Sequence, residues 1–155
     1  MALAGVSTLG ITFGYGTESA VGTKPGTFTE LTRINSIGGI TIENEQIDAS
    51  SLVDEVSRYI RGRGDTGGSF PVTVNLTPDT KTEWSTVIST YAALTGGLRM
   101  WFEVIIPGFT EAFFIVAQPP TSIPMPELNQ NELLTVEFTL TIEEYKGMGE
   151  KVAFS

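Results

Sequence analysis

The sequence predicts a mainly β fold, an antiparallel β-sandwich or flattened barrel with one flanking α-helix. Several segments alternate apolar and polar residues with the period of two that a half-buried strand requires. Only one segment, residues 78–95, repeats its apolar residues at helical spacing. The strands have one apolar face and one face rich in threonine and glutamate, which is typical of antiparallel sheets wetted on one side. The 155 residues are expected to form one domain.

The N-terminal part of the chain is expected to contain short strands. Residues 1–26 are rich in glycine, serine and threonine, which predicts an extended, mobile segment with one short strand at 11–15. Two further strands are predicted at 28–34 and 37–42, separated by a turn at Asn35 and Ser36. The second run continues as a short acidic strand that stops at a serine pair, residues 50–51.

The central part of the chain predicts a strand followed by the helix. Apolar residues alternate from 70 to 76, and Pro71 favours the beginning of a strand or the edge of a sheet. Thr77 offers an N-cap oxygen and Pro78 occupies the first helical position, while a glycine pair at 96–97 is expected to end the helix. The apolar face of the helix, which predicts packing on a sheet, consists of Trp84, Val87, Ile88, Tyr91 and Leu94.

Three more strands are predicted toward the C-terminus. Residues 98–106 and 110–117 form a hairpin around a Pro-Gly turn. The proline-rich segment 118–131 predicts a loop, because it is polar and interrupted by prolines. The last strand, within 133–145, has the cleanest alternation, with Val136, Phe138, Leu140 and Ile142 on one side and Thr135, Glu137, Thr139, Thr141 and Glu143 on the other.

The connection formed by residues 50–69 is long for a compact domain, and such connections are usually functional or disordered. It carries apolar residues next to a cluster of arginines, and this basic cluster complements the acidic remainder of the chain. The alternative interpretation is a charged loop that is simply solvated. An exposed arm of this kind needs a partner surface and predicts self-assembly. The expected subunit-interface residues are Leu52, Val53, Asp54, Glu55, Val56, Arg58, Tyr59, Ile60, Arg61 and Arg63.

Charge and composition exclude several classes of function. The chain has 9 basic and 18 acidic residues, and its net charge of −9 disfavours tight binding of nucleic acid. It contains no cysteine and no histidine, which excludes zinc hydrolases, Ser-His-Asp hydrolases and Cys-His proteases, and no cofactor is expected. No apolar run is long enough to span a bilayer, and residues 1–20 lack a signal-peptide pattern, so folding in a cytoplasm without membrane insertion is expected.

Two local motifs carry less information. Glu43, Glu45 and Asp48 are close carboxylates, but the sugar platform of a glycosidase and the ligand spacing of a calcium loop are missing, so a solvated acidic strand face is favoured. Residues 63–65 form an RGD tripeptide, which we interpret as a flexible hairpin tip in a glycine-rich stretch. Its glycines lack the strand–loop–helix context of a phosphate-binding loop.

Three consecutive motifs, GGITIENEQIDASSL, SRYIRGRGDTGG and FPVTVNLTPD, begin at residue 38 and lead into the helix. Together they resemble the major tail tube proteins of long-tailed bacteriophages, and the resemblance extends more loosely to 133–145. It implies hexameric rings that stack into a hollow tube, through which double-stranded DNA passes without tight binding. The arm at 50–69 would then bridge neighbouring subunits or rings.

The resemblance also implies a setting, a virion tail assembled in the bacterial host cytoplasm, with tape-measure, tip and terminator proteins as partners. Tubes of contractile tails and type VI secretion systems share the architecture, so a secretion-tube protein is one alternative. A tail terminator or capping protein that remains a single ring is another. A β-sandwich adhesin or carbohydrate-binding module is the third, and it would need exposed aromatic residues, for which Trp101 and Phe113 are the candidates.

The polar face of the last strand is the best candidate for a lumen wall in such a tube. A sheet joined across subunits would present Glu137, Thr139, Thr141 and Glu143 inward, where carboxylates repel phosphate. The competing placements of this polar stripe are the outside of the tube and the space beneath the helix.

Overall fold

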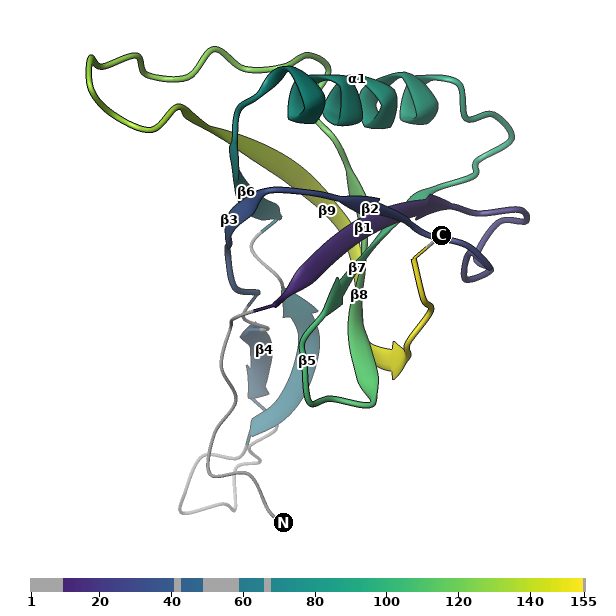
Figure 1. Ribbon diagram of the computed structural model, residues 1–155. Helices are drawn as coiled ribbons and strands as arrows, with labels where there is room; N and C mark the ends of the chain where they lie inside the picture. The colour runs from purple at the N-terminus through teal and green to yellow at the C-terminus, as the bar shows by residue number, and fades with distance from the viewer. Residues whose placement is uncertain (1–9, 41–42, 49–58, 66–67, 155) are drawn as a thin grey trace, which may run out of the picture.

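The computed structural model describes residues 10–40, 43–48, 59–65 and 68–154. Within them, seven strands form one antiparallel sheet, two strands form a separate hairpin, and one helix covers the sheet (Figure 1). The mainly β fold with one flanking helix is therefore confirmed. In spatial order the sheet consists of β2 (Thr29–Leu31), β1 (Thr12–Thr17), β7 (Met100–Ile105), β8 (Glu111–Gln118), β9 (Thr135–Glu150), β6 (Ser69–Asn75) and β3 (Ile34–Ile37).

The sheet is rolled into a flattened barrel with an open seam. β2 and β3 lie at its opposite edges, yet only Thr32 and Arg33 separate them in the sequence. A link of this length spans at most about 11 Å, so the two edges have to curl toward each other. Arg33 makes the sharp turn with a φ of 56°. Among the described residues no ladder joins β2 to β3, so the barrel is not closed.

The turn between these two strands differs from the predicted one. Asn35 and Ser36 lie inside β3, which pairs with β6 around an irregularity between Ile34 and Ser36. The predicted turn was wrong because two adjacent polar residues resemble a turn locally, whereas the pairing of their strand with β6 is a long-range constraint. The strand expected at 37–42 is displaced for the same reason, since β3 ends at Ile37.

Helix α1 (Pro78–Ala92) begins as predicted. The Thr77 hydroxyl accepts a hydrogen bond from the N–H of Thr80, and the Thr80 hydroxyl accepts one from the N–H of Thr77, which is a capping box. The helix ends at Ala92, earlier than expected. Gly96 and Gly97, with φ of 69° and 79°, form the turn beyond it.

Helix α1 lies over one end of the rolled sheet and spans its seam (Figure 1). The Glu83 carboxylate accepts hydrogen bonds from the N–H and the hydroxyl of Thr32, both at 2.7 Å, in the link between β2 and β3. Trp84 is completely buried and stacks on Phe138 of β9, with ring centroids 4.1 Å apart. The helix is thus fixed both to the seam and to the core.

The main core fills the inside of the roll. Phe13 of β1 stacks on Phe102 of β7 with ring centroids 5.5 Å apart, and Phe70 of β6 lies beside them. β9 shows the predicted alternation, because Phe138 and Leu140 are completely buried and the polar residues between them are exposed. Full burial of one such side chain stabilises a fold by about 1.5–3 kcal/mol.

A second apolar cluster lies on the outer face of β7 and β8, where the sequence predicted polar surroundings. Two segments cover this cluster, the one between β1 and β2 and the one at the C-terminus. Phe28 of the first segment forms a parallel bridge with Phe154 of the second. The prediction of a wet outer face was wrong here because residues distant in the sequence cover it. The buried members of this cluster are Phe28, Trp101, Ala112, Phe114 and Val116.

Strand β1 is more deeply integrated than the predicted extended segment. It pairs with β2 on one side and with β7 on the other. Gly14 has to be glycine, because a Cβ there would lie 2.6 Å from the Thr29 carbonyl oxygen and would overlap the Phe154 ring. The later strands β6, β7 and β8 lie where predicted, no helix or strand lies between β8 and β9, and β9 continues to Glu150.

Candidate assembly surfaces

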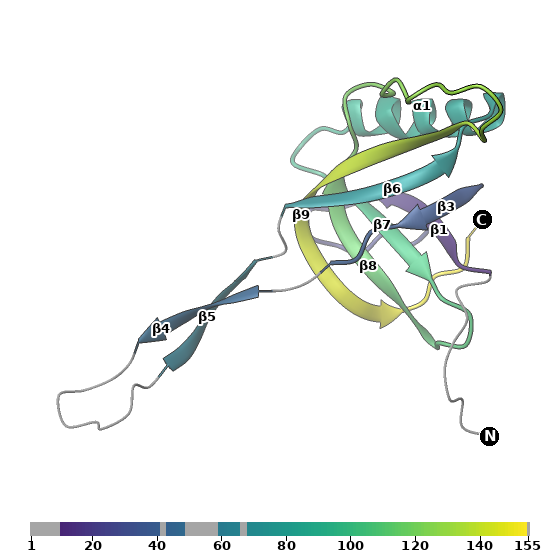
Figure 2. The same cartoon turned by 90° about the vertical axis from the view of Figure 1, so that its left-hand side faces the viewer.

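The predicted arm at 50–69 contributes one strand of a β-hairpin, and the acidic segment before it contributes the other. β4 (Glu43–Asp48) and β5 (Tyr59–Asp65) pair antiparallel, with Gln46 opposite Arg61, and the hairpin projects away from the rolled sheet (Figure 2). The predicted acidic strand is confirmed as β4. The long connection expected at 50–69 is interrupted by β5, which the sequence reading missed because its glycines and arginines are poor strand formers.

Only part of the predicted interface falls on this hairpin. Tyr59, Ile60, Arg61 and Arg63 belong to β5. The described part of the chain gives neither β4 nor β5 a strand partner in the main sheet. An isolated two-stranded hairpin is marginally stable at best in water, so β4–β5 is the element that most needs a partner. The other predicted residues, Leu52, Val53, Asp54, Glu55, Val56 and Arg58, lie outside the described residues.

The polar stripe of β9 lies on the outer face of the sheet. Glu137, Thr139, Thr141 and Glu143 are all exposed, while the residues between them face the core. Because α1 packs on the core side, the placement of the stripe beneath the helix is excluded. Exposure fits both a lumen wall and an outer surface, so the lumen placement stays a prediction.

The stripe carries negative charge that its surroundings leave uncompensated. Glu137 accepts a hydrogen bond from the Thr139 hydroxyl at 3.5 Å, and Glu143 accepts one from the Gln118 amide at 2.6 Å. Among the described residues neither glutamate forms an ion pair, since the salt bridges there join Arg99 to two other glutamates and Lys146 to one of them.

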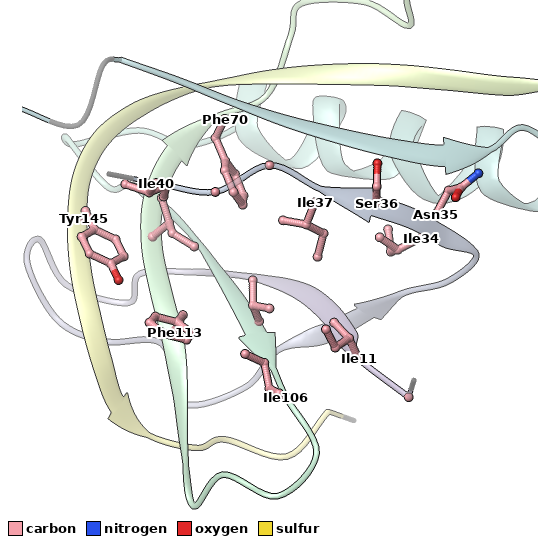
Figure 3. A pocket seen from close by; sticks show the side chains of 15 residues that line it. Ile11, Ile34, Asn35, Ser36, Ile37, Ile40, Phe70, Ile106, Phe113 and Tyr145 are labelled. Carbon is pink, nitrogen blue, oxygen red and sulfur yellow. The ribbon is translucent and has the colours of Figure 1, made fainter. Parts of the chain in front are cut away.

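An apolar cavity of about 840 Å³ opens at the end of the roll away from α1 (Figure 3). Asn35 and Ser36 supply polar groups at its rim (Figure 3), and Gly39 lies where the chain leaves toward β4. The sequence reading did not find this cavity, because it arises from the spacing of strands that are distant in the chain. Most of its wall is apolar, including Ile11, Ile34, Ile37, Phe70, Ile106 and Phe113.

Two glutamates are buried in the outer face of the sheet, and the sequence reading identified neither. Glu18 is 3% exposed, and its carboxylate accepts hydrogen bonds from the indole of Trp101 at 2.8 Å, the N–H of Arg99 at 2.9 Å and the N–H of Gly22 at 3.1 Å. The Arg99 guanidinium adds an ion pair at 3.3 Å. Burial by itself would raise the pKa of Glu18, but these hydrogen bonds outweigh it and hold the pKa below its ordinary value.

Glu103 is completely buried, and its carboxylate accepts fewer hydrogen bonds than that of Glu18. Its Oε2 accepts a hydrogen bond from the N–H of Val152 at 2.8 Å, whereas Oε1 has no partner in the described structure. Burial raises the pKa of Glu103, and the Val152 bond and the charges of Lys24 and Lys151 oppose the rise only in part. Neither buried glutamate lines the cavity, so we assign both to fixing the chain around β7.

Neither aromatic candidate for an adhesin is fully exposed. Trp101 is 5% exposed and packs in the outer cluster, and Phe113 is half-buried in the cavity wall. The adhesin alternative therefore loses Trp101 and keeps Phe113 only as part of the cavity wall. Across the described residues no group of three acidic side chains is placed to hold a metal ion. No helix of the described chain has the length and apolar character needed to cross a membrane.

Comparison with known proteins finds similarity at the level of the fold. No protein-family model matches the chain, and no curated protein matches it in sequence. A chain in the sheath–tube complex of the extracellular contractile injection system PVC, in the extended state, gives a TM-score of 0.55 at 12% identity, over 90% of this chain and 88% of that one. A chain in the baseplate of the anti-feeding prophage AFP gives a TM-score of 0.49 at 15% identity, over 96% of both chains. The chain thus has the fold of a component of a contractile injection system.

Proposed function

We propose that this chain is a structural subunit of a tail-like tube, in which copies assemble into hexameric rings that stack around a hollow lumen. The fold similarity to a chain of a sheath–tube complex supports this, because it extends over nearly the whole length of both chains. At 12% identity that similarity concerns the fold. The argument for assembly therefore rests on the chain's own surfaces.

The unsupported β4–β5 hairpin carries the proposal. Its strands pair only with each other among the described residues, and it projects away from the core (Figure 2). Ordering a backbone costs roughly 1–2 kcal/mol per residue, and a lone hairpin buries too little apolar surface to offset that cost. A neighbouring subunit would supply the missing surface, so we assign the hairpin to the contact between subunits.

The proposed tube conducts double-stranded DNA through a phage tail and is assembled together with tape-measure, tip and terminator proteins. The exposed stripe of β9 suits its lumen, because uncompensated carboxylates repel phosphate and let DNA slide. A second candidate function is the inner tube of a contractile injection or secretion device. The origin of the similar chain, a contractile injection system, favours this candidate.

Negative-stain electron microscopy of the concentrated, purified protein tests the proposal. We expect hollow tubes of constant diameter, with end-on views that average to sixfold symmetry. Single rings that never stack would instead identify a terminator or capping protein. A monodisperse monomer at every concentration and salt condition would contradict a tube-forming subunit.

A further inference from the structure

The proline-rich segment between β8 and β9, residues 119–134, carries an exposed apolar cluster. Met125, Leu128 and Leu133 are 83%, 62% and 69% exposed, and Leu134 is 39% exposed. Single exposed apolar residues are ordinary on protein surfaces, but a group of large ones within one loop marks an interaction site. The loop extends beside α1, at the end of the molecule away from the cavity (Figures 1 and 2).

The apolar cavity at the other end is large enough to receive such a loop. Its volume is about 840 Å³, whereas an apolar cavity of about 150 Å³ already holds a benzene ring. Its wall is dominated by isoleucine and phenylalanine side chains, with Ile37, Ile106 and Phe113 among them (Figure 3). The side chains of several leucine or methionine residues would therefore find both space and apolar contacts there.

We propose that the proline-rich loop of one copy inserts into the apolar cavity of the next copy, and that this is the contact between successive rings of the tube. The inference rests on the proposed function and names its axial contact. The loop and the cavity are different surfaces at opposite ends of one chain, so the contact is heterologous. A heterologous contact that does not close on itself repeats in one direction and produces a filament.

Cysteine cross-linking tests the contact directly, because the natural chain has no cysteine. The test variant combines Leu128→Cys in the loop with Gly39→Cys at the cavity, where an added Cβ meets no atom within 4 Å. A short bifunctional maleimide applied to assembled protein should give a ladder of covalent oligomers on a denaturing gel. The control pairs Gly39→Cys with Val21→Cys, a residue that is also 62% exposed but lies outside the loop. A ladder from the control as strong as that from the test variant would overturn the proposal.

Replacing the apolar side chains separates this proposal from the proposed function. The variant Met125→Gln/Leu128→Gln should still form rings, but should need a protein concentration at least about tenfold higher to form tubes, because it loses buried apolar surface. The control Val21→Gln should assemble like the natural protein. If the variant forms tubes as readily as the natural protein, the loop–cavity contact is wrong and the tube function stands. If the natural protein forms no tubes, the proposed function fails as well. An apolar small molecule found bound in the cavity by native mass spectrometry would show that the loop is not its occupant.

Discussion

The rolled sheet and the β4–β5 hairpin are two regions of opposite physical character. Every strand of the rolled sheet has a strand partner inside the subunit, and α1 is anchored to it through Trp84 and Glu83. The hairpin has no partner beyond itself among the described residues. The first region is stabilised by contacts within the subunit, whereas the described residues give the second no such support. The contrast predicts that the rolled sheet folds without the hairpin and that the hairpin acts in assembly.

Removing the hairpin tests this contrast most severely. A variant in which a short Gly/Ser linker replaces β4 through β5, residues 43–65, should fold and unfold cooperatively, because the main sheet loses no strand. It should form no tubes, since the proposed subunit contact is gone. Circular dichroism with chemical denaturation checks the first expectation, and negative-stain microscopy checks the second. Normal tubes from this variant would remove the hairpin from the assembly contact.

The converse change, within the rolled sheet, should act on folding. Trp84→Ala removes a completely buried ring that stacks on Phe138, and it should lower the free energy of unfolding by about 3–5 kcal/mol. The control Lys81→Ala, on the exposed side of the same helix, should change it by less than about 0.5 kcal/mol. Urea unfolding of the dilute protein measures both, and equal losses would show that α1 does not anchor the core.

The two buried glutamates should give stability profiles of opposite slope with pH. Glu103 has a raised pKa in the fold, so its contribution is complete at low pH and is lost as pH rises through that pKa. Glu18 has a lowered pKa, so its contribution is present above the unfolded value of about 4.3 and is lost as pH falls through the folded pKa.

Unfolding measured from pH 4 to pH 8 checks the two glutamates separately. Glu103→Gln should remove the loss of stability toward higher pH. Glu18→Gln should be most destabilising near neutral pH, where the carboxylate accepts bonds from Trp101 and Arg99. Parallel pH profiles for the two variants would contradict the assignment of opposite pKa shifts.

The arginines of the arm should have a smaller effect on assembly than the whole hairpin. Reversing Arg58, Arg61 and Arg63 to Glu should slow tube formation at low salt, and high salt should restore part of the rate. Exposed ion pairs are individually weak and are screened by salt, so the three are changed together. Light scattering at two salt concentrations measures the rate, and an unchanged rate at low salt would exclude an electrostatic role.

The stripe on β9 should have the smallest effect on the protein itself. Glu137→Lys/Glu143→Lys should change the free energy of unfolding by less than about 0.5 kcal/mol and leave tubes intact, because both residues are exposed. If the stripe lines the lumen, particles that carry the change should release DNA slowly, since the new cations hold phosphate. The control Glu30→Lys/Glu111→Lys makes the same charge change at exposed positions on β2 and β8. Equal DNA release by both variants would place the stripe outside the lumen.

Local patterns predicted most of the elements. The alternation in 135–142 determined which side of β9 is buried, and the cap at Thr77 determined where α1 begins. Failures occurred where a local signal competed with a distant partner. Asn35 and Ser36 are residue types that favour turns, but they lie in β3, which pairs with β6. Trp101 lies on a face predicted to be polar, which the C-terminal residues cover. The arm was recognised by its composition, although its hairpin was not.

Residue type and short spacing were enough to predict the fold class, the apolar face of each clear strand, the position of the helix and the lack of cysteine and histidine chemistry. Three features could be seen only in the folded chain. They are the rolled sheet with its seam at Thr32 and Arg33, the burial of Glu18 and Glu103, and the opposite positions of the apolar loop and the apolar cavity. These features depend on which distant strands pair and which segments cover them. Such choices are made by the burial of surface over the whole chain, and no short window of residues contains them.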